Sequence, residues 1–437
     1  MKQGDNQDII GAKHGLVSSI LLSPWYIPTI VTLAFAIRLC WILVFHPNPV
    51  SDFAFYFRGA ESIARWYSYA PFGVATAYFP IGYPLFLAII FWVFGVSVTV
   101  AQTANLILSV LSIMLAYWIA RELFRSELAG RLSLLFLAIY PDNIAYTSLV
   151  GVEIFHLFLL FLGVALLLPS LSIKEPMHSW RLLTTGLVFG FATLVKVQTL
   201  LLPAFFLILF PQFSWEWRSL VDRLKRVAIL YVALIGVLIP WIIRNCELYN
   251  DIVLSNNDGV NLYIGNGPEA NGTFVAIPWF DVGNDTWAEY KINHIARTKA
   301  TNYMKTHPLQ TLMLMPKKLI ALFDNGDGIN WNTMGTGSEL IFKRYVMSLL
   351  DQVNSIYEFV VFAVFIASLL FGCWKRLRLG KGNGWPLLGI VVILYFIGIY
   401  LVYFGAARFH FPIIPWMIMY SAALLSSLFA IRIRLRT

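Results

Sequence analysis

The first residues that could support chemistry follow the first long apolar run, in the segment that begins at residue 51 with Ser-Asp-Phe-Ala-Phe-Tyr-Phe-Arg. In a helix, Asp52 and Tyr56 would share one face, because residues four apart lie one above the other. A carboxylate in this place can accept a proton from a hydroxyl group. Tyr56 and Arg58 are candidate substrate-binding residues beside it. The alternative is that Asp52 only stabilises a helix N-terminus by its charge.

A second carboxylate, Glu153, lies near the start of an apolar stretch that follows a Tyr-Pro-Asp-Asn turn. An ionisable side chain within a membrane span is expensive, so it indicates a functional site by default. Glu153 could instead reach the interface or bond to a neighbouring helix. Asp142, within the turn, is typical of turn chemistry.

Four basic residues lie at the ends of apolar runs on the same side as these acids: Lys196, Arg244, Arg408 and His410. Each of them alone could be an interfacial anchor. Together they conflict with the rule that loops outside the cytoplasm are poor in Lys and Arg. A phosphate at the outer leaflet would explain them, because a guanidinium binds phosphate oxygens through two parallel hydrogen bonds.

Carboxylates and cations beside a membrane favour the transfer of a sugar from a lipid phosphate. The departing lipid phosphate needs positive charge, and the incoming hydroxyl group needs a base. The sequence contains no Gly-rich nucleotide loop, nucleophile elbow or metal-ligand motif. We therefore expect neither a metal ion nor another cofactor.

The elements that must position these residues are membrane spans. A crossing helix needs about 20 apolar residues. Nine windows meet or approach this length, and one of them is long enough to turn back on itself: 25–45, 99–120, 131–148, 150–170, 182–213, 227–243, 354–374, 385–404 and 411–430. Lys and Arg cluster between these windows, and the positive-inside rule places those clusters and both termini in the cytoplasm. The prediction is an all-α polytopic membrane protein, residues 1–437 forming one domain with roughly ten crossings.

Two long segments then lie on the non-cytoplasmic side, residues 46–99 and 244–351. The first contains Asp52, and its apolar part near residues 81–96 would be an interfacial or re-entrant helix. The second is rich in Asn, Gly and aromatic residues. Loops longer than about 15 residues are usually functional, so these segments should form the site.

Composition supports the membrane assignment, since 59% of the residues are hydrophobic and only 13% are charged. Soluble proteins carry about 25% charged residues. The net charge of +9 does not indicate a nucleic-acid partner, because no basic face or stacking platform is present. The three cysteines form no CxxC pair, so neither zinc nor a disulfide framework is expected.

The order of these motifs resembles the GT-C superfamily of integral membrane glycosyltransferases. It is similar in particular to bacterial proteins that resemble protein O-mannosyltransferases and the lipid A aminoarabinose transferase (family 39-like). Four segments carry the resemblance: residues 51–56 with 78–84, Glu153 in its span, residues 240–268, and residues 408–412. Lys196 and His410 depart from the pattern, since Arg is common at both places.

The resemblance implies a GT-C fold with juxtamembrane helices in the first outer loop, in a bacterial inner membrane. It implies a polyprenyl-phosphate-linked sugar donor and transfer on the periplasmic face to a glycan or lipid of the cell envelope. Asp52 would be the catalytic base, Glu153 would bind the acceptor, and Arg408 and Lys196 would hold the donor phosphate. The alternatives are a ligase or polymerase using lipid-linked oligosaccharides, and a transporter or lipid flippase. The last is disfavoured because no inverted repeat is visible in the hydropathy.

Overall fold

The computed structural model describes residues 20–21, 23–171, 178–209, 217–277, 286–334, 341–379 and 386–434. Every element in these ranges is an α-helix or a short 3₁₀-helix, which confirms the all-α prediction. Residues at both chain ends, and parts of the expected cytoplasmic loops such as Lys174 and Lys381, lie outside the described residues.

Within the described ranges, four helices are long and apolar enough to cross a membrane: α2 (Tyr26–Val44), α5 (Val98–Phe124), α11 (Trp217–Tyr249) and α17 (Ile341–Leu379). A fifth candidate span is broken. It consists of α7 (Pro141–Ala145) with η1 (Tyr146–Ser148), followed by α8 (Val152–Leu167) after a bend of 118°. Shorter apolar helical stretches accompany these spans: α4 (Gly82–Phe94), α9 (Ser179–Val195), Val197–Phe206 with most of α10 (Leu202–Leu209), α18 (Leu388–Val402), and Ile414–Phe429 of α19 (Ile414–Arg434). The chain is therefore a multi-pass membrane protein, while the count of ten crossings stays a prediction.

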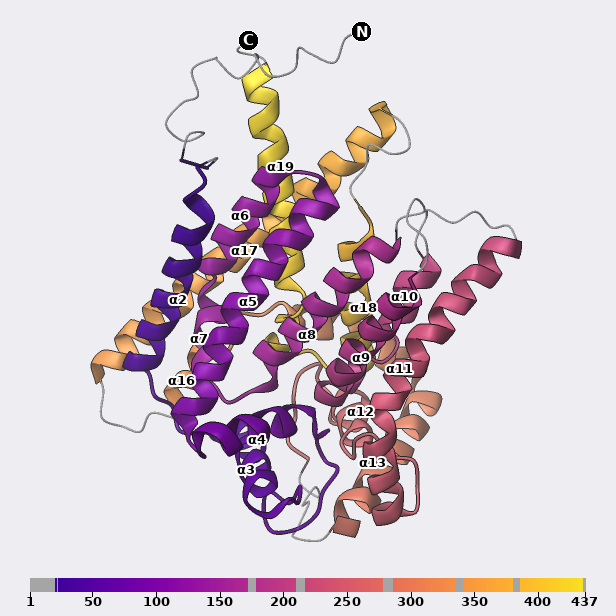
Figure 1. The fold of residues 1–437 in the computed structure, drawn as a ribbon. Coiled ribbons are helices and arrows are strands. Elements are labelled where there is room, and N and C mark those ends of the chain that lie inside the picture. The colour runs from indigo at the N-terminus through magenta and orange to yellow at the C-terminus, as the bar shows by residue number, and fades with distance from the viewer. Residues whose placement is uncertain are drawn as a thin grey trace.

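The apolar helices form one bundle, with further helices gathered at one of its ends (Figure 1). Within the bundle, α8 packs against α5 and α9, α9 against α11, and α19 against both α17 and α6 (Glu127–Ala138). The C-terminal end of α19 projects from the opposite end (Figure 1). The helices at the first end are α3 (Ser51–Trp66), α4, α12 (Asp258–Asn266) and α13 (Thr286–Thr306).

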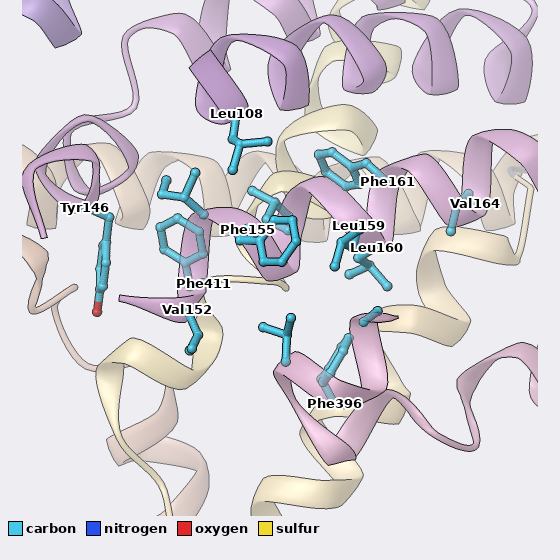
Figure 2. Close-up of a cluster of buried hydrophobic side chains, with 14 of the residues drawn as sticks. Leu108, Tyr146, Val152, Phe155, Leu159, Leu160, Phe161, Val164, Phe396 and Phe411 are labelled. Atoms are coloured by element: carbon cyan, nitrogen blue, oxygen red, sulfur yellow. The ribbon is translucent and has the colours of Figure 1, made fainter. Parts of the chain in front are cut away.

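Helix α8 forms the centre of the bundle because it is apolar nearly all round. Figure 2 shows its side chains packed with Leu108 of α5, Phe396 of α18 and Phe411. In lipid the hydrophobic effect does not drive helices together, so this close packing supplies the association. The first turn of α8, which carries Glu153, is therefore held in a fixed place by this packing.

A buried arginine explains why the chain breaks between α6 and α7. Arg38 of α2 is fully buried and donates hydrogen bonds to the carbonyls of Leu137 (3.2 Å) and Ala138 (3.0 Å) at the end of α6. It also reaches Oδ1 of Asn143 at 2.7 Å. The last carbonyls of a helix need such partners, so α6 can end inside the bundle just before Pro141. The expected apolar window 131–148 is divided at this point.

The two expected outer segments are mostly helical. Residues 46–99 contain α3 and α4, as the juxtamembrane prediction requires. Residues 244–351 contain α12 and α13, followed by three short helices: α14 (Pro308–Met313), α15 (Met315–Leu322) and α16 (Gly328–Met334). Both expected limits of the second segment, residues 244 and 351, lie inside helices. Helix α11 continues to Tyr249, and α17 already begins at Ile341.

Candidate active site

A cavity of about 1200 Å³ lies where the bundle meets the helices at its end. Its lining comes from α3, the start of α8, the turn after α9, α18, α12, α13 and the 3₁₀-helix η4 (Ala407–His410). Five of the eight predicted site residues line it: Asp52, Tyr56, Glu153, Lys196 and Arg408. Segments from across the chain thus meet at one site.

The first charged pair in the cavity joins the first outer segment to the last one. Nη2 of Arg408 lies 2.8 Å from Oδ2 of Asp52, and each side chain is about a quarter exposed (25% and 27%). Burial lowers the pKa of Arg408, but Asp52 and Glu153 more than reverse this and raise it well above its ordinary value. Arg408 is therefore a permanent cation that reaches the cavity.

The second charged pair is more deeply buried. Nζ of Lys196 lies 3.4 Å from Oε1 of Glu153, with exposed side-chain fractions of 12% and 4%. The other oxygen of Glu153, Oε2, is buried and has no hydrogen-bond partner among the described residues. Burial lowers the pKa of Lys196, and the charge of Glu153 offsets this in part. Glu153 thus has one buried oxygen whose hydrogen-bonding capacity is unused among the described residues.

A glycine allows these two regions to approach each other. A Cβ atom at Gly151 would lie 2.5 Å from Oε2 of Glu153 and 2.7 Å from Cε1 of Phe53 in α3. Both contacts are too short for any side chain larger than glycine. Gly151 therefore lets α3, with Asp52, rest directly against the start of α8.

Tyr56 lines the same cavity, near Asp52, Glu153 and Arg408. Burial raises its pKa well above 10, and the nearby Asp52 and Glu153 raise it further. The phenol therefore stays neutral and can donate a hydrogen bond. Within the cavity, Asp52 is thus paired with Arg408 and Glu153 with Lys196.

The structure places Arg58, Arg244 and His410 outside the cavity lining. Arg58 is exposed and lies 5.2 Å over the ring of Phe72. Arg244 donates hydrogen bonds to the backbone carbonyls of Thr76 (2.7 Å) and Tyr69 (3.4 Å), so it fastens the first outer segment. His410 is buried and faces α17 instead. We therefore leave these three out of the proposed site.

Sequence reasoning missed the outer end of the cavity, which α12 and α13 supply. Asp258 and Arg297 form an ion pair there, with Nη2 and Oδ2 2.6 Å apart, and both line the cavity. Asn293 donates to Asp258 at 2.9 Å. The polar sequence of α13 was the available signal, but nothing in its spacing places it near Asp52.

Comparisons with known proteins agree with this architecture. Residues 79–243 match the family model described as dolichyl-phosphate-mannose-protein mannosyltransferase. No curated protein matches the chain. Among solved structures, the chain is similar to the oligosaccharyltransferase of Archaeoglobus fulgidus in its apo form, with a TM-score of 0.54 and 13% identity over 93% of this chain and 51% of that chain. It is also similar to ArnT of Cupriavidus metallidurans bound to undecaprenyl phosphate, with a TM-score of 0.48 and 13% identity over 92% of this chain and 77% of that one.

The chain has the fold of the GT-C integral membrane glycosyltransferases, which confirms the expected resemblance. The family match begins in the first outer segment and ends in α11, so it includes Glu153 and Lys196. The chain spans about half the length of the archaeal oligosaccharyltransferase.

Proposed function

We propose that this protein is a membrane glycosyltransferase that moves a sugar from a polyprenyl-phosphate-linked donor to a glycan or lipid of the cell envelope. The reaction would take place on the periplasmic face of a bacterial inner membrane, with both termini in the cytoplasm. The observation that carries the proposal is the meeting of two carboxylate–cation pairs, Asp52–Arg408 and Glu153–Lys196, in one cavity.

The shape of the cavity supports a lipid-linked donor. Leu201, Phe205 and Leu394 line it, and their side chains are exposed although they are apolar. They belong to the bundle, whereas the opposite part of the lining is polar and comes from α12 and α13. A polyprenyl chain would lie along the apolar part, while its phosphate would meet Arg408 and Lys196. The name of the matched family also refers to a polyprenyl phosphate sugar, dolichyl phosphate mannose.

The proposed reaction is a single displacement with inversion at the anomeric carbon. The donor phosphate binds Arg408 and Lys196, and the exchange of partners frees the Asp52 carboxylate. Asp52 takes the proton of the acceptor hydroxyl group as its oxygen forms a bond to the anomeric carbon. The bond between that carbon and the phosphate oxygen breaks, and the polyprenyl phosphate leaves with its charge held by the two cations. Glu153 and Tyr56 orient the acceptor.

The test is mass spectrometry of envelope glycans and lipids from cells that lack this protein, complemented with variants. Wild-type protein should restore a mass increment of one sugar. Asp52→Asn should reduce that increment by about 10²-fold or more, since a general base contributes about 10²–10⁴-fold. Glu61→Gln is the matched control, because Glu61 lies on the same helix and pairs with Arg65 at the surface. Full restoration by Asp52→Asn in a folded, membrane-inserted protein would refute the assignment of the base.

A further inference from the structure

A second cluster of ionisable groups lies in the protein interior, apart from the cavity. It consists of Asp142 of α7, Glu358 of α17 and His410 of η4. Each offers one ligand atom, and these atoms all lie within 4.8 Å of one another. The residues are buried, with exposed fractions of 0%, 8% and 1%. None of them lines the candidate active site.

Two buried polar atoms of this cluster lack a hydrogen bond to any described residue, and one of the two has only an ion-pair contact. Oδ2 of Asp142 and Nε2 of His410 make no hydrogen bond to any described residue. Nε2 lies 3.4 Å from Oε1 of Glu358, close enough for an ion pair but not arranged as a hydrogen bond. A buried polar atom without a hydrogen bond is costly, so two in one place indicate a missing partner.

The remaining atoms of the three side chains are held by hydrogen bonds. Nδ1 of His410 lies 2.8 Å from the carbonyl of Leu322 and can only donate to it, which leaves the lone pair on Nε2 free. Oε1 of Glu358 accepts from Tyr140 at 2.8 Å. Oδ1 of Asp142 accepts from the backbone N–H of Gly328 at 2.8 Å. Outer partners of this kind orient the ligands in metal sites.

The chain also wraps closely around the cluster. A Cβ atom at Gly326 would lie 2.7 Å from Cγ of Asp142 and 2.8 Å from Oε1 of Glu358. A Cβ at Gly328 would lie 2.6 Å from Oδ1 of Asp142. Glycine at both positions leaves just enough room for the carboxylates to converge.

We propose that Asp142, Glu358 and His410 bind one divalent metal ion, with Zn²⁺ as the best fit. One imidazole nitrogen and two carboxylate oxygens are ligands that Zn²⁺ prefers, whereas Ca²⁺ and Mg²⁺ take oxygen ligands. Two carboxylates and a neutral imidazole carry two negative charges, which one divalent ion neutralises in a buried place. The expectation from the sequence was that no metal binds, because these three residues lie far apart along the chain and no ligand motif links them.

The alternative to a metal ion is a proton on Nε2 of His410, which would face Glu358. Burial lowers the pKa of His410, but Glu358 and Asp142 raise it to about 9, so the imidazole would be cationic when no metal is bound. That arrangement still leaves Oδ2 of Asp142 without a hydrogen bond to any described residue. The two possibilities differ in metal content, which can be measured directly.

A metal here would position the active site without touching substrate. It would join α7, α17 and η4, and η4 also carries Arg408, two residues before His410. This consequence, unlike metal binding itself, rests on the proposed function. We expect metal removal to weaken donor binding through Arg408 and to leave the protein able to take up the ion again.

The test measures metal content in the full-length protein purified in detergent. After treatment with a chelator and titration with Zn²⁺, plasma mass spectrometry should find about one ion per chain in the wild type. His410→Gln and Asp142→Asn should lose it. His307→Gln is the matched control, because His307 is exposed and stacks on Tyr303 away from the cluster. Absence of bound metal in the titrated wild type, or equal metal in the wild type and both cluster variants, would overturn the proposal.

A milder variant guards against loss of folding. Tyr140→Phe removes only the hydroxyl group that donates to Glu358 and should weaken Zn²⁺ binding about 10- to 100-fold, as other outer-partner changes do. Replacement of Zn²⁺ by Co²⁺ should give visible absorption bands that His410→Gln abolishes and His307→Gln keeps. None of these measurements uses transferase activity. The metal-site proposal can therefore be refuted while the proposed function stands, and the proposed function can be refuted while the metal site stands.

Discussion

The ion pair between Asp52 and Arg408 sets the starting state of the proposed reaction. At an effective dielectric of about 20, two charges this close attract each other by roughly 4 kcal/mol before solvent is considered. Both side chains are only about a quarter exposed, so breaking the pair would leave a largely buried charge unpaired unless another anion takes the place of the carboxylate. A donor phosphate would take that place at Arg408. The same exchange that binds the donor releases the base.

Arg408→Ala should affect donor binding more than acceptor binding. Losing a hydrogen bond to a charged group costs about 1.5–3 kcal/mol, so the donor KM should rise about 10- to 100-fold. The acceptor KM should change by less than about threefold, because no acceptor contact is lost. Arg65→Ala is the control, since Arg65 pairs with Glu61 at the surface. A donor KM unchanged in Arg408→Ala would exclude Arg408 from the phosphate site.

Lys196 predicts an alkaline limit to donor binding. Burial lowers its pKa below the ordinary 10.5, so Lys196 loses its charge at a lower pH than an exposed lysine. Below that pKa it carries the charge that attracts the phosphate, and above it the attraction is lost. The donor KM should therefore rise as the pH increases toward 10. Lys196→Arg should remove this rise, because arginine stays protonated. Superimposable alkaline profiles for the two proteins would contradict the role of Lys196.

The predicted site residues that meet in the cavity at charged pairs share one property. Asp52, Glu153, Lys196 and Arg408 all interrupt or adjoin apolar runs, where a charge requires a reason. Arg244 has the same property but holds backbone carbonyls. Residue type and position cannot distinguish a cation that binds a ligand from one that binds the chain itself.

The cluster of Asp142, Glu358 and His410 was also hard to predict, because residue type and position do not show which residues meet in space. Asp142 has the sequence context of a turn, and it does lie at the start of the short helix α7. Its closeness to Glu358 and His410 depends on the packing of three distant elements. No local pattern carries that information.

At the scale of elements, one buried carboxylate ties together the segments that surround the cavity. Glu289 of α13 accepts hydrogen bonds from Oγ1 of Thr76 (2.5 Å) and the backbone N–H of Ala77 (2.8 Å) in the first outer segment. It also accepts from Nδ2 of Asn256 (3.0 Å) and from the hydroxyl group of Tyr249 at the end of α11. These four donors satisfy both oxygens of the buried carboxylate. Three segments are thus fixed by one side chain.

Glu289→Ala should loosen these segments without unfolding the bundle. The loss of hydrogen bonds to a charged group should cost on the order of 3 kcal/mol, equivalent to roughly a 100-fold change in a local opening equilibrium. Hydrogen exchange should accelerate in residues 69–80 and 249–257 and stay unchanged in α5 and α8. Glu247→Ala is the control, since Glu247 is exposed on α11. Equal exchange in both variants would show that Glu289 does not hold the segments.

Helix positions followed well from the sequence because an apolar run of about 20 residues has the length that a bilayer crossing requires. The windows 25–45, 99–120 and 354–374 correspond to α2, α5 and the apolar part of α17. The break between α6 and α7 did not follow from the apolar pattern, because Arg38, which satisfies the end of α6, comes from a helix about a hundred residues earlier.

At the scale of the whole molecule, charge and shape define two different ends. The cavity lies at the end that carries α3, α12 and α13 (Figure 1). The C-terminal end of α19, followed in the sequence by Arg436, lies at the other end. The positive-inside rule assigns the second end to the cytoplasm. The donor's phosphate would then be reached from the periplasm.

This sidedness can be tested with two matched cysteine substitutions in a variant whose three native cysteines are replaced by alanine. Tyr67 at the end of α3 is 83% exposed, and Leu377 near the end of α17 is 86% exposed, so both positions are open to a reagent. A maleimide that cannot cross membranes should label Tyr67→Cys in intact spheroplasts. It should label Leu377→Cys only after the membrane is permeabilised, because Leu377 lies in a cluster of Lys and Arg. The opposite pattern would place Asp52 and Arg408 in the cytosol, where a periplasmic acceptor could not reach them.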